Sequence, residues 1–374
     1  MSVSATNATR RAILAGAAGT AFAWCAGGLA QRPASPIIAY DPHFLTLIDP
    51  RQSIAVVVEG QGLGTVPAGQ EEDFGASLES PNWWEGENFL LFSDIPRNRI
   101  MKWSPGAGLS VFLEPSGHAN GLWRDPAGRL LMAEHGGRQV SRIEPDGSRT
   151  VIMRSYRNQR LHRPNTVIVR SDGGIYFTDY GFRADPVEDW DLDFDGIYYV
   201  SPDLGTRRLL TRDVVEPHKI LFSRDERTLL VGQRRGILAF DVGDIQRPNP
   251  AENQRGGRLV PESRRWFWQA GADPAEPAII QTLVANRSTI VDGMKMDTEG
   301  NVWIGGREGV WAISAAGKLI GRIDTSGMGR GAPNLCFGGN DGRTLFIATN
   351  HSILSVRTRV RGVPIGPRRA GSAS

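Results

Sequence analysis

Short apolar runs alternate with tight-turn sequences along most of the chain, most clearly in residues 120–145. In that stretch, the turn sequences DPAG at 125–128 and GG at 136–137 separate three strand-like segments. Turns of Asp, Pro and Gly between apolar runs of four or five residues are typical of β-hairpins. The stretch therefore predicts an antiparallel meander.

The same unit occurs six times, and its second strand is the part that is easiest to recognise. Successive second strands begin 40, 45, 54, 73 and 43 residues apart, a spacing typical of propeller blades with insertions in some loops. The repeat predicts an all-β fold, a six-bladed β-propeller over residues 51–361, and we expect the run at 53–60 to pair with the last blade and close the ring. The six second strands are LLFSD at 90–94, LLMAE at 130–134, IYFTD at 175–179, LLVGQ at 229–233, VWIGG at 302–306 and LFIAT at 345–349.

A polar residue stands 10 or 11 residues ahead of each second strand, where the innermost strand of the blade is expected to begin. Equivalent positions of six radial blades converge on one axis, so this ring is the candidate active site. Its members are Glu79, Asn120, Asn165, His218, Asp292 and Asn334.

Both ends of the chain are expected to lie outside the propeller. Residues 1–30 have the pattern of a twin-arginine export signal, with Arg10 and Arg11 ahead of an uncharged apolar run that ends in GLA. An uncleaved membrane anchor is the less favoured alternative, because the run is only weakly hydrophobic. We therefore expect a periplasmic or secreted protein, with residues 31–50 as a linker and 362–374 as a disordered tail.

The fourth repeat carries an insertion at 244–275 that includes the aromatic sequence WFW at 266–268. Such a segment either covers one face of the ring and contacts substrate or packs on itself at the surface. The second interpretation is the favoured one.

Charge and composition limit the classes of molecule that the protein is expected to bind. The formal net charge is +3, and loss of residues 1–30 leaves +1, which gives no basic surface for nucleic acid or, after signal cleavage, for an anionic membrane. Cleavage would also remove Cys25 and leave Cys336 without an intrachain disulfide partner. The expected partner is a small molecule, and the sequence does not indicate an oligomeric state.

The ring residues favour binding of a divalent cation. Carboxylates and Asn carbonyls form a hard oxygen set suited to Ca²⁺, Mg²⁺ or Mn²⁺, and a His shifts the preference toward Mn²⁺ or Zn²⁺. The alternative is that polar residues only cap strands and hold water. We favour that alternative for Asn120 and Asn334. We favour a cation for the other four, because two carboxylates buried near one axis are costly without one.

Several long segments resemble the six-bladed propeller family of senescence marker protein 30, gluconolactonase and luciferin-regenerating enzyme. The resemblance covers roughly residues 79–355. The segments that carry it are ESPNWW at 79–84, LLFSDIPRNRIMKW at 90–103, RPNTVIVRSDGGIYFTDYG at 163–181, VDGMKMDTEGNVW at 291–303 and CFGGNDGRTLFIAT at 336–349.

The resemblance implies one divalent cation held by Glu79, Asn165 and Asp292, with His218 where a second Asn is usual. It also implies hydrolysis of a sugar-type lactone, as in gluconolactonases, with the cation polarising the carbonyl and Asp292 as general base. Two segments depart from the family pattern, namely HKI at 218–220 for Asn-Gly-Leu and Asn165-Thr166 for Asn-Asp.

Substrate contacts are expected from Arg163, Asn120 and His118, and Lys219 is expected to place a positive charge beside the ring, unless it is a solvated surface lysine. Because His218 replaces a usual ligand, the alternative function is a non-catalytic or retuned propeller that binds a small molecule. Phosphate-ester hydrolysis and metal-free condensation occur on related propellers, so they also stay open.

Overall fold

The computed structural model describes residues 35–60, 62–68, 77–181, 190–246, 254–328 and 331–366, and Ser35–Ser374 form one compact unit. The predicted export signal lies outside the described residues. Within the described ranges, no helix is both long enough and apolar enough to cross a membrane.

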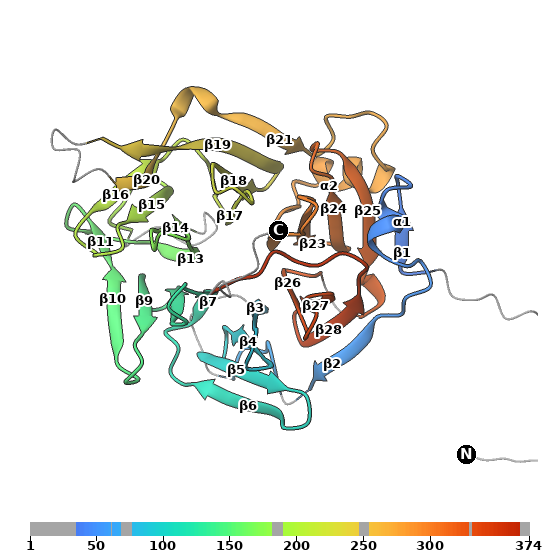
Figure 1. Ribbon diagram of the computed structural model, residues 1–374, viewed down its shortest axis with the longest axis horizontal. Helices are drawn as coiled ribbons and strands as arrows, with labels where there is room; N and C mark the ends of the chain where they lie inside the picture. The colour runs from blue at the N-terminus through green and yellow to red at the C-terminus, as the bar shows by residue number, and fades with distance from the viewer. Residues whose placement is uncertain are drawn as a thin grey trace, which may run out of the picture. The chain divides into compact units, whose positions relative to one another are not determined.

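Six antiparallel sheets surround a central axis, and this arrangement confirms the six-bladed propeller (Figure 1). The first blade contains β3 (Leu78–Trp84), β4 (Phe89–Asp94), β5 (Arg99–Ser104) and β6 (Gly108–Leu113). The second contains β7 (Ala119–Arg124), β8 (Leu130–Glu134), β9 (Gln139–Ile143) and β10 (Arg149–Met153). The third contains β13 (Arg163–Val169), β14 (Ile175–Tyr180), β15 (Gly196–Val200) and β16 (Arg207–Thr211).

The other three blades carry additional strands. The fourth contains β17 (Lys219–Phe222), β18 (Thr228–Gln233), β19 (Gly236–Ile245), β20 (Gln254–Leu259) and β21 (Arg265–Gln269). The fifth contains β22 (Met294–Met296), β23 (Val302–Gly306), β24 (Gly309–Ile313), β25 (Leu319–Asp324) and β1 (Ile37–Ala39). The sixth contains β26 (Asn334–Gly338), β27 (Thr344–Ala348), β28 (Ser352–Arg357) and β2 (Ala55–Glu59). The remaining elements are the β11 (Ser155–Tyr156) and β12 (Gln159–Arg160) pair, α1 (Phe44–Leu47), α2 (Ala278–Ala285) and the 3₁₀ turns η2 (Pro261–Ser263) and η3 (Ser326–Met328).

The N-terminal strands complete two blades. β2 pairs with β28, which confirms that the run at 53–60 closes the ring. The prediction of a linker is wrong for residues 35–50, because β1 pairs with β25 and the Phe44 and Leu47 side chains are fully buried, and residues 31–34 lie outside the described residues. Gly321 of β25 makes room for this packing, since a Cβ there would lie 2.1 Å from Phe44 Cδ1.

Repeated Asp-to-Gly turns connect the first and second strands of blades. At 125–129, the Gly128 amide donates to the Asp125 carbonyl at 2.9 Å, and the Arg129 amide donates to the Asp125 carboxylate at 2.8 Å. Gly128 has a φ of 84°, a left-handed conformation that Gly adopts without the steric cost that other residues meet. Where they occur, these sequences therefore fix the position at which the hairpin reverses.

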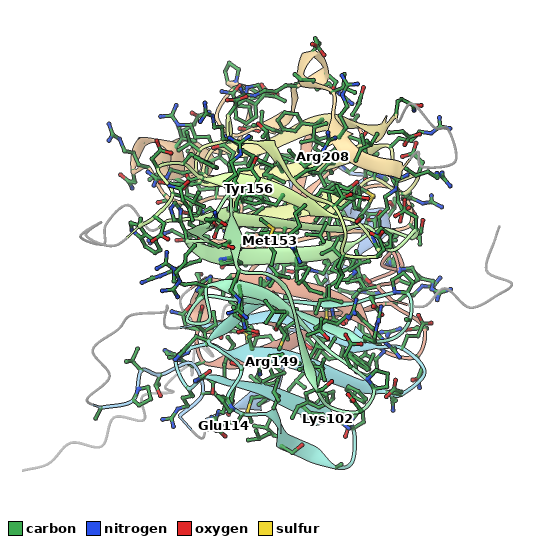
Figure 2. All side chains as sticks on the ribbon, turned by 90° about the vertical axis from the view of Figure 1, so that its left-hand side faces the viewer. Lys102, Glu114, Arg149, Met153, Tyr156 and Arg208 are labelled. Atoms are coloured by element: carbon green, nitrogen blue, oxygen red, sulfur yellow. The ribbon has the colours of Figure 1, made fainter. Side chains whose placement is uncertain are left out.

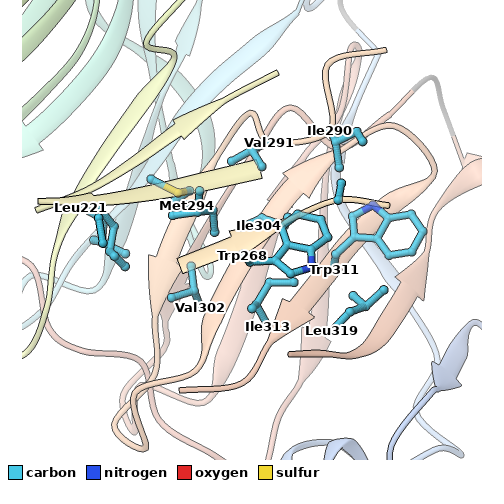
Figure 3. Close-up of a cluster of buried hydrophobic side chains, with 14 of the residues drawn as sticks. Leu221, Trp268, Ile290, Val291, Met294, Val302, Ile304, Trp311, Ile313 and Leu319 are labelled. Atoms are coloured by element: carbon cyan, nitrogen blue, oxygen red, sulfur yellow. The ribbon is translucent and has the colours of Figure 1, made fainter. Parts of the chain in front are cut away.

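Apolar side chains from neighbouring blades fill the space between sheets. In the cluster drawn in Figure 3, Leu221 and Trp268 of the fourth blade pack with Ile304 and Trp311 of the fifth. Each fully buried side chain of this size contributes about 2–3 kcal/mol. Trp268 belongs to β21, so this part of the fourth-blade insertion continues the blade, whereas residues 247–253 lie outside the described residues.

A C-terminal segment crosses the middle of the ring, where Figure 1 draws it in dark red. Gly362 forms an isolated bridge with Asp297, and the Val363 amide donates to the Met296 carbonyl at 2.9 Å. Residues 362–366 are thus placed by contacts with the fifth blade. The predicted disordered tail stays a prediction for residues 367–374.

Candidate active site at the start of the innermost strands

Irregular pairing at the start of three innermost strands sets the direction of the axial side chains. A bulge leaves a residue out of the ladder and re-aims its side chain, so the backbone here departs from regular alternation. The register shifts lie between Glu79 and Asn82 in β3, between Ala119 and Gly121 in β7, and between Pro164 and Val167 in β13.

Glycines next to two ring residues let neighbouring innermost strands approach closely. A Cβ on Gly121 would lie 2.5 Å from the Asn165 carbonyl oxygen, and one on Gly293 would lie 2.6 Å from Asn334 Cα. No side chain fits at either position without backbone movement. The glycines that follow Asn120 and Asp292 therefore reflect close packing around the axis.

The fourth blade presents Lys219 to the axis beside His218, the residue that the sequence spacing predicts. Lys219 pairs with Gly232, the fourth residue of LLVGQ. By strand pairing Lys219 corresponds to Glu79 and Asn334. His218 corresponds to Asp292, because the His218 amide donates to the Gly232 carbonyl at 2.9 Å and the Asp292 amide donates to the Gly305 carbonyl at 2.8 Å. The matching pairs in other blades are Glu79 with Ser93 and Asn334 with Ala348.

The Lys219 ammonium joins three oxygen atoms from three other blades. Its Nζ lies 2.9 Å from Asn120 Oδ1, 3.4 Å from Glu79 Oε2 and 3.7 Å from Asp292 Oδ1. The side chains of Lys219 and Glu79 are each only 4% exposed, whereas that of Asp292 is 27% exposed. The solvated-lysine alternative is therefore excluded, and Glu79, Asn120, Lys219 and Asp292 form one group, which we call the axial cluster.

A second amide extends the axial cluster on the side of the sixth blade. Asn334 Nδ2 donates to Glu79 Oε2 at 2.8 Å, and the Ser80 amide donates to the same oxygen at 3.2 Å. Burial raises the pKa of Glu79, with the Lys219 ammonium acting against this shift and the Asp292 carboxylate adding to it. Burial also raises the pKa of Asp292, and Lys219 again opposes it.

His218 and Asn165 meet in a separate group around Tyr180. Asn165 Nδ2 donates to the Tyr180 hydroxyl at 3.4 Å, and that hydroxyl lies 3.4 Å from His218 Nδ1. Burial lowers the pKa of His218 to about 4, and the Lys219 ammonium acts in the same direction. The imidazole is therefore neutral at neutral pH. Asn165 Oδ1 accepts a hydrogen bond from the Thr166 hydroxyl at 3.3 Å.

Two predicted substrate-contact residues, His118 and Arg163, lie against neighbouring parts of the chain. The His118 imidazole lies against the first blade, with Nδ1 2.8 Å from the Ile95 carbonyl oxygen. Arg163 begins β13, and its guanidinium lies 5.6 Å from the centre of the Trp190 ring. Their role in binding substrate stays a prediction.

An open cavity of about 630 Å³ reaches the axial cluster at Asp292. Its lining also includes Arg307 and Asn350, so it provides a route from solvent to the part-exposed carboxylate. Another cavity, of about 650 Å³, lies away from the axis between outer strands, where Figure 2 shows Tyr156 and Arg208. We assign the candidate site to the first cavity because it touches the axial cluster.

The axial cluster has oxygen atoms that suit a divalent cation, but the Lys219 ammonium lies among them. A divalent ion about 4 Å from that ammonium would be repelled by about 8 kcal/mol at an effective dielectric constant of about 20. Across the described ranges, no three His, Cys, Asp or Glu side chains lie close enough together to hold a metal ion. With Lys219 in this position, the residues do not fit a divalent cation.

Sequence reasoning missed two features of the site. Tyr180 ends β14, and its contacts with Asn165 and His218 depend on pairing between β13 and β14. The second is the reach of the Lys219 ammonium to Glu79 and Asn120 in other blades. The spacing alone fits both residues. Lys219 lies 10 residues before LLVGQ, the interval of Asn120, Asn165 and Asp292, and His218 lies 11 residues before it, the interval of Glu79 and Asn334.

Comparisons with known proteins identify the family and the fold. The family model described as "SMP-30/Gluconolactonase/LRE-like region" matches residues 78–351. A gluconolactonase of Zymomonas mobilis is 30% identical over 301 residues, which cover 76% of this chain and 79% of that protein.

The solved structure of a gluconolactonase from Xanthomonas campestris aligns with a TM-score of 0.66 and 25% identity over 88% of this chain and 99% of that one. A luciferin-regenerating enzyme structure, with 13% identity and a TM-score of 0.59 over 84% of this chain and 98% of that one, shares the fold. A matched region that includes all six ring positions and both glycines of the axis makes this chain a member of the SMP-30/gluconolactonase/LRE-like family.

Proposed function

We propose that this protein hydrolyses a lactone of the sugar-acid type at the axial cluster. The observation that carries the proposal is a part-exposed carboxylate, Asp292, which lines an open cavity and lies 3.7 Å from the buried Lys219 ammonium. Membership in a family that includes gluconolactonases supports the choice of a cyclic ester as substrate.

Asp292 is the proposed general base. It takes a proton from a water molecule as the water oxygen attacks the lactone carbonyl carbon. Burial raises the pKa of Asp292 and strengthens it as a base, while its 27% exposed side chain can meet water in the cavity. Glu79 is more deeply buried and accepts hydrogen bonds from Asn334 and Ser80, which suits it to hold the cluster together.

Lys219 supplies the positive charge for the transition state. Its ammonium donates to the cluster oxygens and acts through its charge, which favours the negative charge that develops on the carbonyl oxygen, and its low exposure limits screening by water. Collapse of the tetrahedral intermediate breaks the ring C–O bond. The leaving alkoxide then takes up the proton held by Asp292, which gives the open hydroxy acid.

The second group supplies the proposed contacts with substrate hydroxyls. The neutral His218 imidazole, the Tyr180 hydroxyl and the Asn165 amide form a set of hydrogen-bonding groups beside the cluster. Arg163, at the start of the same innermost strand as Asn165, is the proposed partner of a more distant oxygen. Such a set favours a polyhydroxylated lactone over an apolar one.

A dependence on Ca²⁺, Mn²⁺, Zn²⁺ or Mg²⁺ is the prediction of the family resemblance, and the proposed steps do not use it. The alternative is a propeller that binds a small molecule without catalysis. The position of Lys219 supports it equally, because a lysine at the axis is compatible with both hydrolysis and binding alone. Export by the twin-arginine pathway stays a proposal from residues 1–30.

Hydrolysis of an aldonolactone by the purified protein tests the proposal, with acid release measured after subtraction of the spontaneous rate. Asp292→Asn should lower kcat/KM by about 10²–10⁴-fold, because the base is lost while size and fold are kept. Asp146→Asn is the matched control, since Asp146 lies in the exposed turn between β9 and β10. Lactone binding without turnover by the unmodified protein would support the binding alternative and refute hydrolysis.

A further inference from the structure

We propose that the Lys219 ammonium is the resident cation of this propeller and takes the place of a divalent metal ion. The inference deepens the proposed function. Only its catalytic part, the role of Lys219 in lactone hydrolysis, rests on that function. Its structural part concerns which cation balances the carboxylates at the axis.

The position of Lys219 in the ladder is the first support. Lys219 pairs with Gly232 as Glu79 pairs with Ser93, and its ammonium reaches Asn120 Oδ1 at 2.9 Å, so the lysine side chain extends to the axis. His218, which the sequence pattern offers as a metal ligand, instead lies against Tyr180, with ring centres 4.7 Å apart. The fourth blade thus offers a cation at the axis where a ligand was predicted.

The contacts of the ammonium are the second support. Lys219 is in the fourth blade, and its three oxygen partners come from the first, second and fifth blades, at 3.4, 2.9 and 3.7 Å. A bound metal ion joins separate strands in the same manner, by gathering oxygen ligands. An ammonium has three N–H donors, which matches the three oxygen atoms of the axial cluster.

The choice of lysine is the third support. The chain has 43 basic residues, of which only Lys102, Lys219, Lys295 and Lys318 are lysines. Arginine carries a planar fork suited to bidentate pairing, whereas lysine carries a compact point charge. A chain that otherwise uses arginine therefore has a compact charge where oxygen atoms converge from several directions.

Charge balance is the fourth support. Glu79 and Asp292 bring two carboxyl groups together, and such groups are stable in a buried position only with a compensating cation. Lys219 provides that cation within the chain. Removal of its charge should make the same oxygen atoms available to a divalent ion.

Elemental analysis and calorimetric titration with Ca²⁺, Mn²⁺ or Zn²⁺ alone test this inference. Unmodified protein should contain less than about 0.1 divalent ion per chain and show no binding heat, whereas Lys219→Ala should bind about one ion per chain. Lys318→Ala is the control, because Lys318 is 64% exposed and pairs with Asp41 at the surface. It should behave like the unmodified protein.

Activity gives a second readout through Lys219→Met, which removes the charge and keeps most of the side-chain length. Lactone hydrolysis by the unmodified protein should resist a chelator, and Lys219→Met should lower kcat/KM by about 10²–10³-fold. The two proposals can fail separately. If the unmodified protein is metal-free and hydrolyses no lactone, while Lys219→Ala binds an ion, Lys219 is the resident cation and the proposed function is refuted.

The inference is overturned if the unmodified protein carries about one divalent ion that a chelator removes together with its activity. It is also overturned if a folded Lys219→Ala variant gains no affinity for any of the three ions. Should that variant not fold, the ion content and chelator response of the unmodified protein decide between the two cations.

Discussion

Asp179 is a buried carboxyl group with incomplete hydrogen bonding. It lies at the end of the second strand of the third blade and accepts a hydrogen bond from the His162 amide at 2.9 Å on Oδ2. Its Oδ1 has no hydrogen-bond partner among the described residues. Burial raises the pKa of Asp179 to about 7, and the nearby Asp195 carboxylate adds to the shift.

The raised pKa predicts how stability depends on pH. The folded carboxyl keeps its proton up to about pH 7, whereas the unfolded one loses it above about pH 4, so unfolding releases a proton between these values. The contribution of Asp179 to the free energy of unfolding therefore falls as pH rises from 4 to 7. Asp179→Asn should remove this loss and gain stability relative to the unmodified protein, by up to about 4 kcal/mol at pH 8 and little at pH 4.

Urea unfolding of both proteins at pH 4, 6 and 8 measures the difference. Asp213→Asn serves as the control, because Asp213 is exposed in the connection between β16 and β17. Parallel stability curves for Asp179→Asn and the unmodified protein would contradict the prediction.

At the residue level, the sequence predicted the types of groups at the axis better than their contacts. Glu79 and Asp292 lie close together as expected, because both follow the blade spacing. The spacing allowed either His218 or Lys219, and the contacts of the Lys219 ammonium with Glu79 and Asn120 show which side chain joins the axial cluster. Contacts of a long side chain such as Lys219 depend on three other blades and cannot be derived from its own repeat.

Close packing of the innermost strands β7 and β13 depends on Gly121. A Cβ at this position would lie 2.5 Å from the Asn165 carbonyl oxygen and 2.9 Å from Thr166 Cα, and backbone atoms have little freedom to move. Gly121→Ala should therefore lower the free energy of unfolding by about 2–3 kcal/mol. Because the shift would also move Asn165, we expect a lower kcat/KM in the same variant.

Chemical denaturation and lactone kinetics test both effects of Gly121→Ala. Gly243→Ala is the matched strand control, since a Cβ there would meet its nearest neighbour, Val260 Cγ2, at an ordinary 3.5 Å. It should change stability by less than about 0.5 kcal/mol. Equal stability of the two alanine variants would contradict the prediction, because it would show that β7 and β13 can move apart at Gly121 without loss of stability.

At the element level, turn chemistry made the blades predictable. The Asp-to-Gly turns and apolar second strands located all six sheets, since both are set by local sequence. The strand at Ile37–Ala39 was missed because it is short and its pairing with β25 joins residues far apart in the chain. The bulges of β3, β7 and β13 likewise follow from contacts between blades and have no clear local signal.

At the scale of the whole propeller, the C-terminal segment and the axial cluster lie at opposite ends of the innermost strands. The cluster uses residues at the starts of these strands, whereas the segment contacts Met296, the last residue of β22. Val363 and Ile365 line a cavity of about 320 Å³ together with Trp123 and Leu221, which belong to the second and fourth blades. The segment therefore bridges several blades at the end of the axis away from Asp292.

Truncation after Arg361 should weaken this bridging without removing the axial cluster. It deletes Gly362 and Val363, with their contacts to Asp297 and Met296, so we expect Tm to fall by about 3–6 °C. Amide hydrogen exchange should become faster in β22, because its last carbonyl loses a donor. Lactone kcat should change by less than about twofold, since the chemistry lies at the other end of the axis.

Truncation after Gly366 is the matched control, because it keeps every described contact of the segment and removes only residues 367–374. Calorimetry and hydrogen exchange on both truncations separate the bridging residues from the remaining tail. If the two proteins have the same Tm and the same exchange in β22, residues 362–366 do not stabilise the ring. If only the shorter protein is destabilised, ring closure depends on this segment in addition to the pairing of β2 with β28.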